Sequence, residues 1–372
     1  MQTIRAWLER HLNDPQVVAL SALLLILASV ILFFGNMLAP VFASLVVAYL
    51  LEGVVGALER RRIGRTLAVV IVFLLFIGFV VVVSLALIPT LSRQVAQLVE
   101  NLPNMLDRGQ SALLKLPDQY PQLFSREQVT NLLATVRNEA VDFGRSIVAS
   151  LSLQSVVRIF TLLLYAILVP MLVFFFLKDK RPLLDWLAQF LPRHRHLADT
   201  VWHDVDVQIG NYVRGKFIEI LIVWSVAYVT FVFFDLQFAM LLGVLVGLSV
   251  IIPYVGATAV TIPIAIVAYF QFGASPEFLW IMLAYLIIQM LDGNVLVPLL
   301  FSEVVNLHPV AIIIAILIFG GLWGFWGVFF AIPLATVIKA VINAWPRSSD
   351  EEEADNVVAA SSADTEAPCH EG

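Results

Sequence analysis

The chain has 372 residues, of which 60% are hydrophobic and 13% are charged, and its mean hydropathy is +0.91. Soluble domains are about 45–50% apolar and about 25% charged, so the composition excludes an ordinary soluble protein and predicts an all-α polytopic membrane protein. The formal net charge of −6 indicates nothing about substrates, because residues 350–372 hold eight acidic and no basic side chains, which leaves 20 acidic against 22 basic elsewhere.

Six apolar stretches are long enough for membrane-spanning helices, which need about 20 mostly apolar residues. They are residues 17–35, 38–52, 66–90, 159–177, 217–234 and 278–300. Gly35, Asn36 and Pro40 mark a break between the first two stretches, and Pro89 marks the end of the third. We therefore expect about six full spans, together with two further apolar segments in the C-terminal half that are interrupted.

Basic residues predict the orientation of the spans, because cytoplasmic loops carry an excess of Lys and Arg. The loops at 59–65, 177–182 and 192–196 are all basic and fall on one side of the membrane in this count. The N- and C-termini fall on the same side. Both termini are therefore expected in the cytoplasm, and residues 91–150 are expected outside it.

Segment 91–150 has helical periodicity, with apolar residues such as Leu91, Val95 and Leu98 on one stripe. This pattern is typical either of an arm that gates a transport path or of helices that pack on neighbours or on the membrane surface. A helical outer arm also favours a homo-oligomer. Loop 178–216 has an apolar face beside basic residues, which predicts an interfacial helix.

Metal, disulfide and cofactor sites are not predicted. The pattern His194-x-His196, with His203 and Asp204 nearby, is too weak to indicate a metal site. The single cysteine, Cys369, excludes a disulfide within the chain. No cofactor and no nucleic-acid partner is expected.

Two stretches in the C-terminal half resemble each other, residues 235–265 and 306–335. Each contains a Leu followed by a polar residue, then an apolar arm, a break rich in Pro or Gly, and an Ile-Pro pair. The break at 253–256 aligns with the break at 324–327. Each stretch follows a full span, so counting passes makes the two units inverted repeats, although apolar sequences also align by chance.

The hairpins formed by these stretches are expected to be broken or re-entrant. Their first arms, about 238–251 and 310–322, are too short at 1.5 Å per residue to cross a hydrocarbon core of ~30 Å. Non-helical backbone at that depth is tolerated only where it is buried in protein or lines a wet cavity. The predicted hairpin tips are Pro253, Tyr254, Gly256, Gly324 and Gly327, and the predicted hinges are Pro263, Pro298 and Pro333.

The stretch QMLDGNVLVP (289–298) places Gln289, Asp292 and Asn294 inside an apolar run. A carboxylate at membrane depth is costly and usually marks an ion or substrate path. Transport sites between inverted repeats lie near the midplane beside broken helices, so Asp292 is predicted to bind a cation, a proton or a polar substrate. Gln289 and Asn294 are its predicted neutral partners. The alternative is a helix that ends early, with Asp-Gly-Asn as an interfacial turn.

Other polar residues have simpler expected roles. His308 is a further candidate for the transport site because histidine is the side chain whose ordinary charge change falls near physiological pH, but a histidine beside a proline also commonly caps a helix. Asp235 and Glu219 lie near the ends of predicted spans and are expected to face water, and the same holds for Glu52.

Several motifs resemble the signature regions of the autoinducer-2 exporter family, also called the PerM-type permeases. They are FFFLKD (174–179), YVRGK (212–216), IIPYVG (251–256), QMLDGNVLVP (289–298), NLHPVAIIIAIL (306–317) and GLWGFWGVFFAIPLATVIK (321–339). The resemblance covers most of residues 10–345. It implies a bacterial inner-membrane protein that exports a small molecule or, in some members, exchanges sodium for protons. The family usually has Glu at the position of Asp292, which keeps the charge, and Gly near Glu303.

We expect a secondary transporter whose partners are the lipid bilayer and a small polar solute or monovalent cation. The alternatives are a non-transporting membrane scaffold and a passive channel. An enzyme is not expected. Intramembrane aspartyl proteolysis needs two carboxylates that meet at membrane depth, and only Asp292 is expected there. The motifs His-Glu-x-x-His, Gly-x-Ser-x-Gly and a complete Walker Gly-x-x-x-x-Gly-Lys-Ser/Thr are also absent from the sequence.

The expected organisation has five parts. They are N-terminal membrane helices (1–90), an extracytoplasmic amphipathic helical arm (91–150), a fourth span with a cytoplasmic amphipathic loop (151–204), an inverted-repeat transport core (205–345) and a disordered acidic tail (346–372). The tail is polar, acidic and without periodicity.

Overall fold

The computed structural model describes most of the chain between residues 33 and 344. The described ranges are 33–35, 37–113, 156–189, 196–253, 255–301 and 308–344, with isolated positions at 26, 29, 30, 131, 135 and 142. Every regular element in these ranges is a helix, and no strand occurs among them. The first predicted span, at 17–35, and the acidic tail lie almost wholly outside the described residues.

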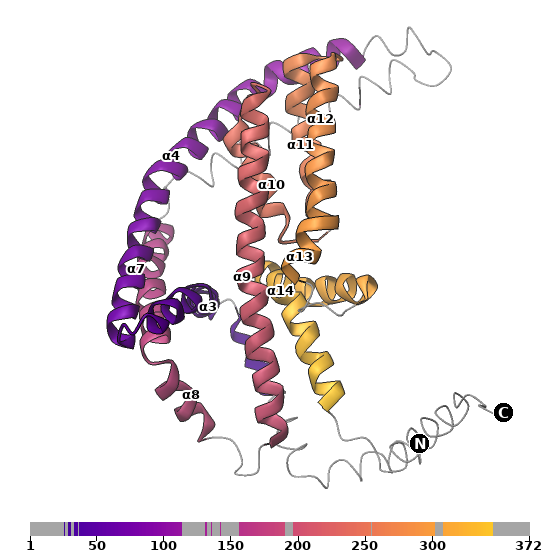
Figure 1. The fold of residues 1–372 in the computed structure, drawn as a ribbon. Coiled ribbons are helices and arrows are strands. Elements are labelled where there is room, and N and C mark those ends of the chain that lie inside the picture. Colours follow the sequence, from indigo (N-terminus) through magenta and orange to yellow (C-terminus); the bar gives the residue numbers. More distant parts are fainter. Residues whose placement is uncertain are drawn as a thin grey trace, which may run out of the picture.

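In Figure 1, α4, α9, α11 and α12 run roughly along one direction, whereas α3 and part of α14 lie across them. Their bounds are α3 (Ala39–Arg60), α4 (Arg65–Leu113), α7 (Val156–Lys178), α8 (Lys180–Ala188), α9 (His196–Phe233), α10 (Ala239–Ser249), α11 (Val255–Phe272), α12 (Pro276–Leu291), the π-helical turn η1 (Asp292–Leu296), α13 (Val297–Phe301) and α14 (Pro309–Ala344). Seven helical segments among the described residues are long and apolar enough to cross a membrane. The chain is therefore a multi-pass α-helical membrane protein, as the composition predicts.

Two predicted spans differ from the observed helices in their ends. Pro89 lies inside α4, which continues as one helix to Leu113. A proline inside a membrane helix is tolerated where other groups satisfy the freed backbone. The fifth span was predicted to begin at residue 217, whereas α9 already begins at His196. Residues 214–219 therefore lie in the middle of a long helix and not at its entry.

Helix α9 is the central element, and it packs against α3, α10, α12, α13 and α14. Its contact with α10 is close because α10 presents two glycines four residues apart. A Cβ added at Gly247 would lie 2.6 Å from the Cβ of Trp224, and one added at Gly243 would lie 3.1 Å from the Cβ of Tyr228. Small residues at this spacing let helix backbones approach each other within a membrane.

The outer half of α4 packs against the same core. Leu91, Val95 and Leu98 contact a buried cluster formed by α9, α10, α11 and α12. This part of the predicted apolar stripe thus packs on neighbouring helices. Most of the remainder of segment 91–150 lies outside the described residues.

The first predicted hairpin is interrupted. Helix α10 has 11 residues and so spans only about 16 Å. Non-helical backbone at 250–253, including Pro253, separates it from α11, while Tyr254 lies outside the described residues. A Cβ at Gly256 would lie 1.8 Å from the carbonyl oxygen of Ser249, so the second arm starts directly against the end of the first.

The second predicted hairpin breaks at Gly324. This residue has φ 61° and ψ −135°, which interrupts α14 at a conformation that glycine adopts without strain. A Cβ at Gly327 would lie 1.8 Å from the carbonyl oxygen of Phe319. Pro263, Pro298 and Pro333 all lie within helices, in α11, α13 and α14, and their role as hinges stays a prediction.

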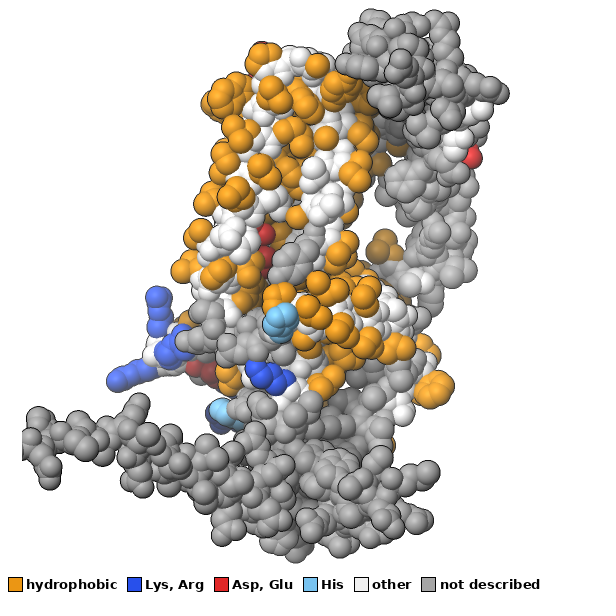
Figure 2. Space-filling model, turned by 90° about the vertical axis from the view of Figure 1, so that its right-hand side faces the viewer, with side chains coloured by type: hydrophobic (Ala, Val, Ile, Leu, Met, Phe, Trp, Pro, Cys, Tyr) orange, Lys and Arg blue, Asp and Glu red, His pale blue; other side chains and the backbone are white. Residues whose placement is uncertain are grey.

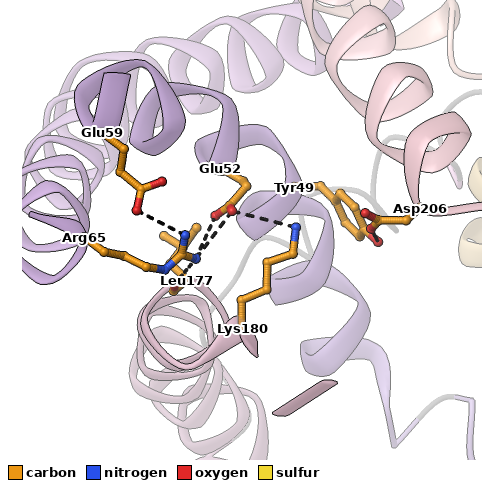
Figure 3. A network of polar contacts seen from close by, with 7 residues as sticks. All are labelled: Tyr49, Glu52, Glu59, Arg65, Leu177, Lys180 and Asp206. Atoms are coloured by element: carbon orange, nitrogen blue, oxygen red, sulfur yellow. Dashed lines mark hydrogen bonds and ion pairs between the residues drawn. The ribbon is translucent and has the colours of Figure 1, made fainter. Parts of the chain in front are cut away.

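Ion pairs join the ends of α3, α4, α7 and α8 (Figure 3). Arg65 lies 3.4 Å from carboxylate oxygens of both Glu52 and Glu59, and it donates a hydrogen bond to the carbonyl oxygen of Leu177 at 2.8 Å. Lys180 lies 3.7 Å from Glu52. These side chains are a quarter to a third exposed, so the network orients the helix ends more than it stabilises the fold.

Candidate functional site

The carboxylate of Asp292 lies at a helical irregularity in the C-terminal half of the chain. Asp292–Leu296 form a π-helical turn between α12 and α13, and the amide of Val297 bonds to the carbonyl of Asp292. The helix therefore does not end at Asp-Gly-Asn, and the interpretation of this stretch as an interfacial turn is wrong. Single π-helical turns inside α-helices occur frequently at functional sites.

Asp292 and Gln289 present polar atoms without partners at this turn. The Oδ1 of Asp292 and the Nε2 of Gln289 are buried, and neither has a hydrogen-bond partner among the described residues. The two residues are three positions apart, so they share one face of the helix. Buried polar atoms are normally paired, and an exception calls for an explanation such as a bound ion or a functional role.

Helix α9 contributes a buried ion pair to the same region. The Nζ of Lys216 lies 2.7 Å from the Oε2 of Glu219, and the two side chains are only 5% and 2% exposed. The same ammonium donates a hydrogen bond to the carbonyl oxygen of Val250 at 2.9 Å. It also lies 5.2 Å from the centre of the Phe301 ring, within the range of a cation–π interaction.

These three charged residues form one electrostatic unit. Asp292 lies close enough for its charge to interact with both Lys216 and Glu219. The unit contains two carboxylates and one ammonium, so its net charge is −1 when all three are ionised. An uncompensated charge is costly in an apolar interior, and one further monovalent cation neutralises it. Figure 2 shows a small acidic area at mid-height, bordered mainly by apolar and uncharged side chains, while the basic side chains and further acidic ones lie lower down.

Tyr212, one turn before Lys216 on α9, bonds to the second hairpin. Its hydroxyl donates to the carbonyl oxygen of Phe329 at 3.1 Å, and its ring packs against those of Phe301 and Phe329. Tyr212 and Lys216 are one turn apart, so α9 bonds to the second hairpin through one residue and to the first through the other.

Two predicted site residues are not part of this unit. Asn294 is exposed, and its amide donates to the carbonyl oxygen of Met290 in its own helix at 2.9 Å. His308 is exposed at the start of α14, and its Nδ1 accepts a bond from the amide of Val310 at 3.3 Å. The structure therefore favours helix capping for His308, which was the alternative interpretation.

Sequence reasoning missed Lys216 and Glu219. Glu219 was expected to face water near a span end, but it is among the most buried side chains of the described chain. The error arose because α9 begins 21 residues before the predicted span, at His196 rather than 217. Opposite charges three residues apart beside an apolar run were the available signal, since such residues face each other on a helix.

We also compared this region with a nucleotide-binding loop and with a cluster of metal ligands. Residues 210–216 match the first seven positions of a Walker motif, but Phe217 stands where Ser or Thr is required, and the stretch is helical rather than a loop. Among the described residues, no group of three or more His, Cys, Asp and Glu side chains is placed to hold a metal ion.

Comparison with known proteins gives one family. The family model described as "AI-2E family transporter" matches residues 20–347. The chain is 44% identical over 346 residues to the "Putative permease PerM" of Escherichia coli (strain K12), covering 93% of this chain and 98% of that protein. It is 27% identical to the "Putative transport protein YueF" of Bacillus subtilis (strain 168), over 83% of this chain and 84% of that protein. It is 24% identical to the "AI-2 transport protein TqsA" of Escherichia coli (strain K12), over 89% and 92%.

Proposed function

This chain belongs to the AI-2E transporter family, and we propose that it is a cation-coupled secondary transporter in which sodium and protons compete for Asp292. Exchange of sodium for protons is the activity that the site favours. Export of a small polar molecule, coupled to the same cation, is the second candidate. It is favoured by the name of the relative TqsA, an AI-2 transport protein.

One observation carries the proposal: a buried carboxylate oxygen without a partner among the described residues, in a unit whose net charge is −1 when its three groups are ionised. The Oδ1 of Asp292 has no hydrogen-bond partner among the described residues. The neighbouring Lys216 is already paired with Glu219. A proton or a sodium ion at Asp292 supplies the missing positive charge. Neither a membrane scaffold nor a passive channel requires a buried, unpartnered carboxylate.

The broken hairpins supply the moving parts. We propose that α9–α11 and α12–α14 are inverted repeats that rock about the site, as in other secondary transporters. The matched glycines support this, since an added Cβ would lie 1.8 Å from a carbonyl oxygen of the preceding arm at both positions, that of Ser249 for Gly256 and that of Phe319 for Gly327. We also propose the extracytoplasmic helical arm (91–150), the homo-oligomer and the five-part division of the chain that the sequence predicts.

The proposed location is the bacterial inner membrane, with both termini in the cytoplasm. The organisms of the relatives support a bacterial membrane, since PerM and TqsA are from Escherichia coli and YueF is from Bacillus subtilis. Basic residues support the orientation. Arg60, Arg61, Arg62 and Lys178 gather at the joined ends of α3, α4 and α7, which is the pattern of a cytoplasmic loop.

A flux measurement tests the proposed function. The purified protein is placed in liposomes that contain a pH-sensitive dye, and a sodium gradient is imposed. The wild type is expected to move protons against sodium, whereas Asp292→Asn is not. Asp235→Asn is the matched control, because Asp235 is exposed beyond the end of α9. If the wild type moves no protons under sodium, pH or combined gradients, sodium–proton exchange is wrong.

A further inference from the structure

We infer that Lys216 is a latch, an ammonium that holds the broken end of α10 closed against α9 and releases it when a cation binds at Asp292. The inference assigns coupling to a residue that neither binds the transported ion nor lies in a hairpin. It rests on the proposed function in one respect, the cation at Asp292. The closure of the hairpin by Lys216 is independent of it.

The latch acts on the terminal carbonyl groups of α10. Val250 is the C-terminal cap of α10, and the chain turns out of helical geometry directly after it. The last carbonyls of a helix have no intrahelical partner and carry its negative dipole end. The ammonium of Lys216 meets the carbonyl of Val250 at 2.9 Å, so it supplies both the missing hydrogen bond and a favourable charge.

Burial makes this ammonium depend on its anionic neighbours. The side chains of Lys216 and Glu219 are 5% and 2% exposed, so water solvates neither charge appreciably. The ammonium is held in place by Glu219 at 2.7 Å and by the ring of Phe301. A buried ammonium that loses the field of its carboxylates is strongly destabilised. Its hold on Val250 therefore depends on the net charge of Glu219 and Asp292.

A cation at Asp292 changes that net charge. Among the described residues, Glu219 on α9 and Asp292 on η1 interact electrostatically with Lys216, and Tyr212, one turn before it on α9, interacts with Glu219. Sodium or a proton at Asp292 removes one of the two negative charges that attract the ammonium. The closed state, in which the ammonium is buried against Val250, is then less stable, and the end of α10 is free to part from α9. Ion occupancy is thereby converted into opening of the first hairpin.

A cysteine reporter tests the latch without measuring transport. The chain has one cysteine, Cys369, so a Cys369→Ser background is free of thiols. Ser249→Cys places a thiol at the end of α10, where the native side chain is 8% exposed and bonds to the carbonyl of Val246. Its rate of reaction with N-ethylmaleimide in detergent micelles reports how often the hairpin opens.

Removal of the ammonium is expected to open the hairpin. Lys216→Met should speed labelling by about tenfold or more, the change expected when a hydrogen bond from a charged group is lost. Lys216→Arg, which keeps the charge, should restore a slow rate. Arg214→Gln is the matched control, because Arg214 lies on the same helix and bonds to Asn211. The double variant Lys216→Met/Glu219→Gln leaves no unpaired buried carboxylate, so fast labelling there is not caused by misfolding.

The coupling is tested by sodium in the same assay. Wild-type labelling should be faster in sodium chloride than in choline chloride of equal ionic strength, and Asp292→Asn should abolish this difference. If Lys216→Met and the double variant both label at the wild-type rate, there is no latch, whatever the flux assay gives. If Lys216→Met labels fast but sodium and pH leave the wild-type rate unchanged, Lys216 does not couple ion binding to opening. A failed flux assay with these labelling changes intact overturns the proposed exchange alone.

Discussion

Tyr212 and Lys216 lie one helical turn apart on α9 and bond to different hairpins, Tyr212 to the carbonyl of Phe329 at 3.1 Å and Lys216 to the carbonyl of Val250 at 2.9 Å. Both carbonyls lie close to a helix interruption, one just after the break at Gly324 and the other at the end of α10. If either hairpin moves relative to α9, its hydrogen bond to α9 has to break; otherwise α9 has to move with the hairpin. Helix α9 is thus bonded to both hairpins through two residues one turn apart.

The bond from Tyr212 is expected to stabilise the second hairpin. Tyr212→Phe keeps the ring contacts with Phe301 and Phe329 but leaves the carbonyl of Phe329 without its donor. The free energy of unfolding should fall by about 1–2 kcal/mol, which lowers the Tm in detergent by a few degrees. Tyr165→Phe is the control, because Tyr165 is exposed. Equal Tm values for the two variants would show that the bond from Tyr212 does not restrain the hairpin.

The two hairpin glycines are expected to be irreplaceable. At Gly256 and Gly327 an added Cβ would lie 1.8 Å from a backbone oxygen, so even alanine forces the arms apart. Gly256→Ala and Gly327→Ala should each abolish the monodisperse peak on size exclusion. Gly321→Ala should leave it unchanged, because a Cβ there meets nothing within 4 Å. Normal elution of either hairpin variant contradicts the close contact described above.

The Lys216–Glu219 ion pair is expected to be strongly non-additive. Lys216→Met alone should cost about 3–5 kcal/mol, because it leaves a buried carboxylate unpaired, whereas the double variant with Glu219→Gln should cost clearly less. Denaturation in mixed micelles measures both. Glu59→Gln is the surface comparison. Its pair with Arg65 is 3.4 Å long and about a third exposed, so its loss should cost less than about 1 kcal/mol. Additive single and double effects would contradict a buried ion pair.

The sequence predicted the membrane spans and the hairpin breaks because both are local properties. A span needs a run of apolar residues, and a break needs Pro253 or Gly324 within one. Asp292 and Gln289 were found for the same reason, as polar residues inside an apolar run. The continuation of α4 past Pro89 was not predicted, because a proline ends many helices and only the packing of Leu91, Val95 and Leu98 reveals that this one goes on.

Local pattern shows Lys216 and Glu219 as opposite charges three residues apart, but it does not show that they are buried. Glu219 is buried because α9 begins at His196 and because η1 and α10 pack against α9. These are contacts between segments that lie far apart in the sequence. Asn294 looked equivalent to Gln289 in sequence. Its position two residues after Asp292 places it on another face of the helix, where it bonds to Met290.

Competition between sodium and protons at Asp292 is the central claim, and proton release measures it most directly. Purified protein in detergent is held in weakly buffered solution with a pH indicator, and sodium chloride is added. Wild type and Asp235→Asn are expected to release protons in a saturable way when sodium chloride is added, whereas choline chloride should give no release and Asp292→Asn should give none with sodium. Release of the same size from Asp292→Asn, or no release from the wild type at any starting pH, would contradict competition at Asp292.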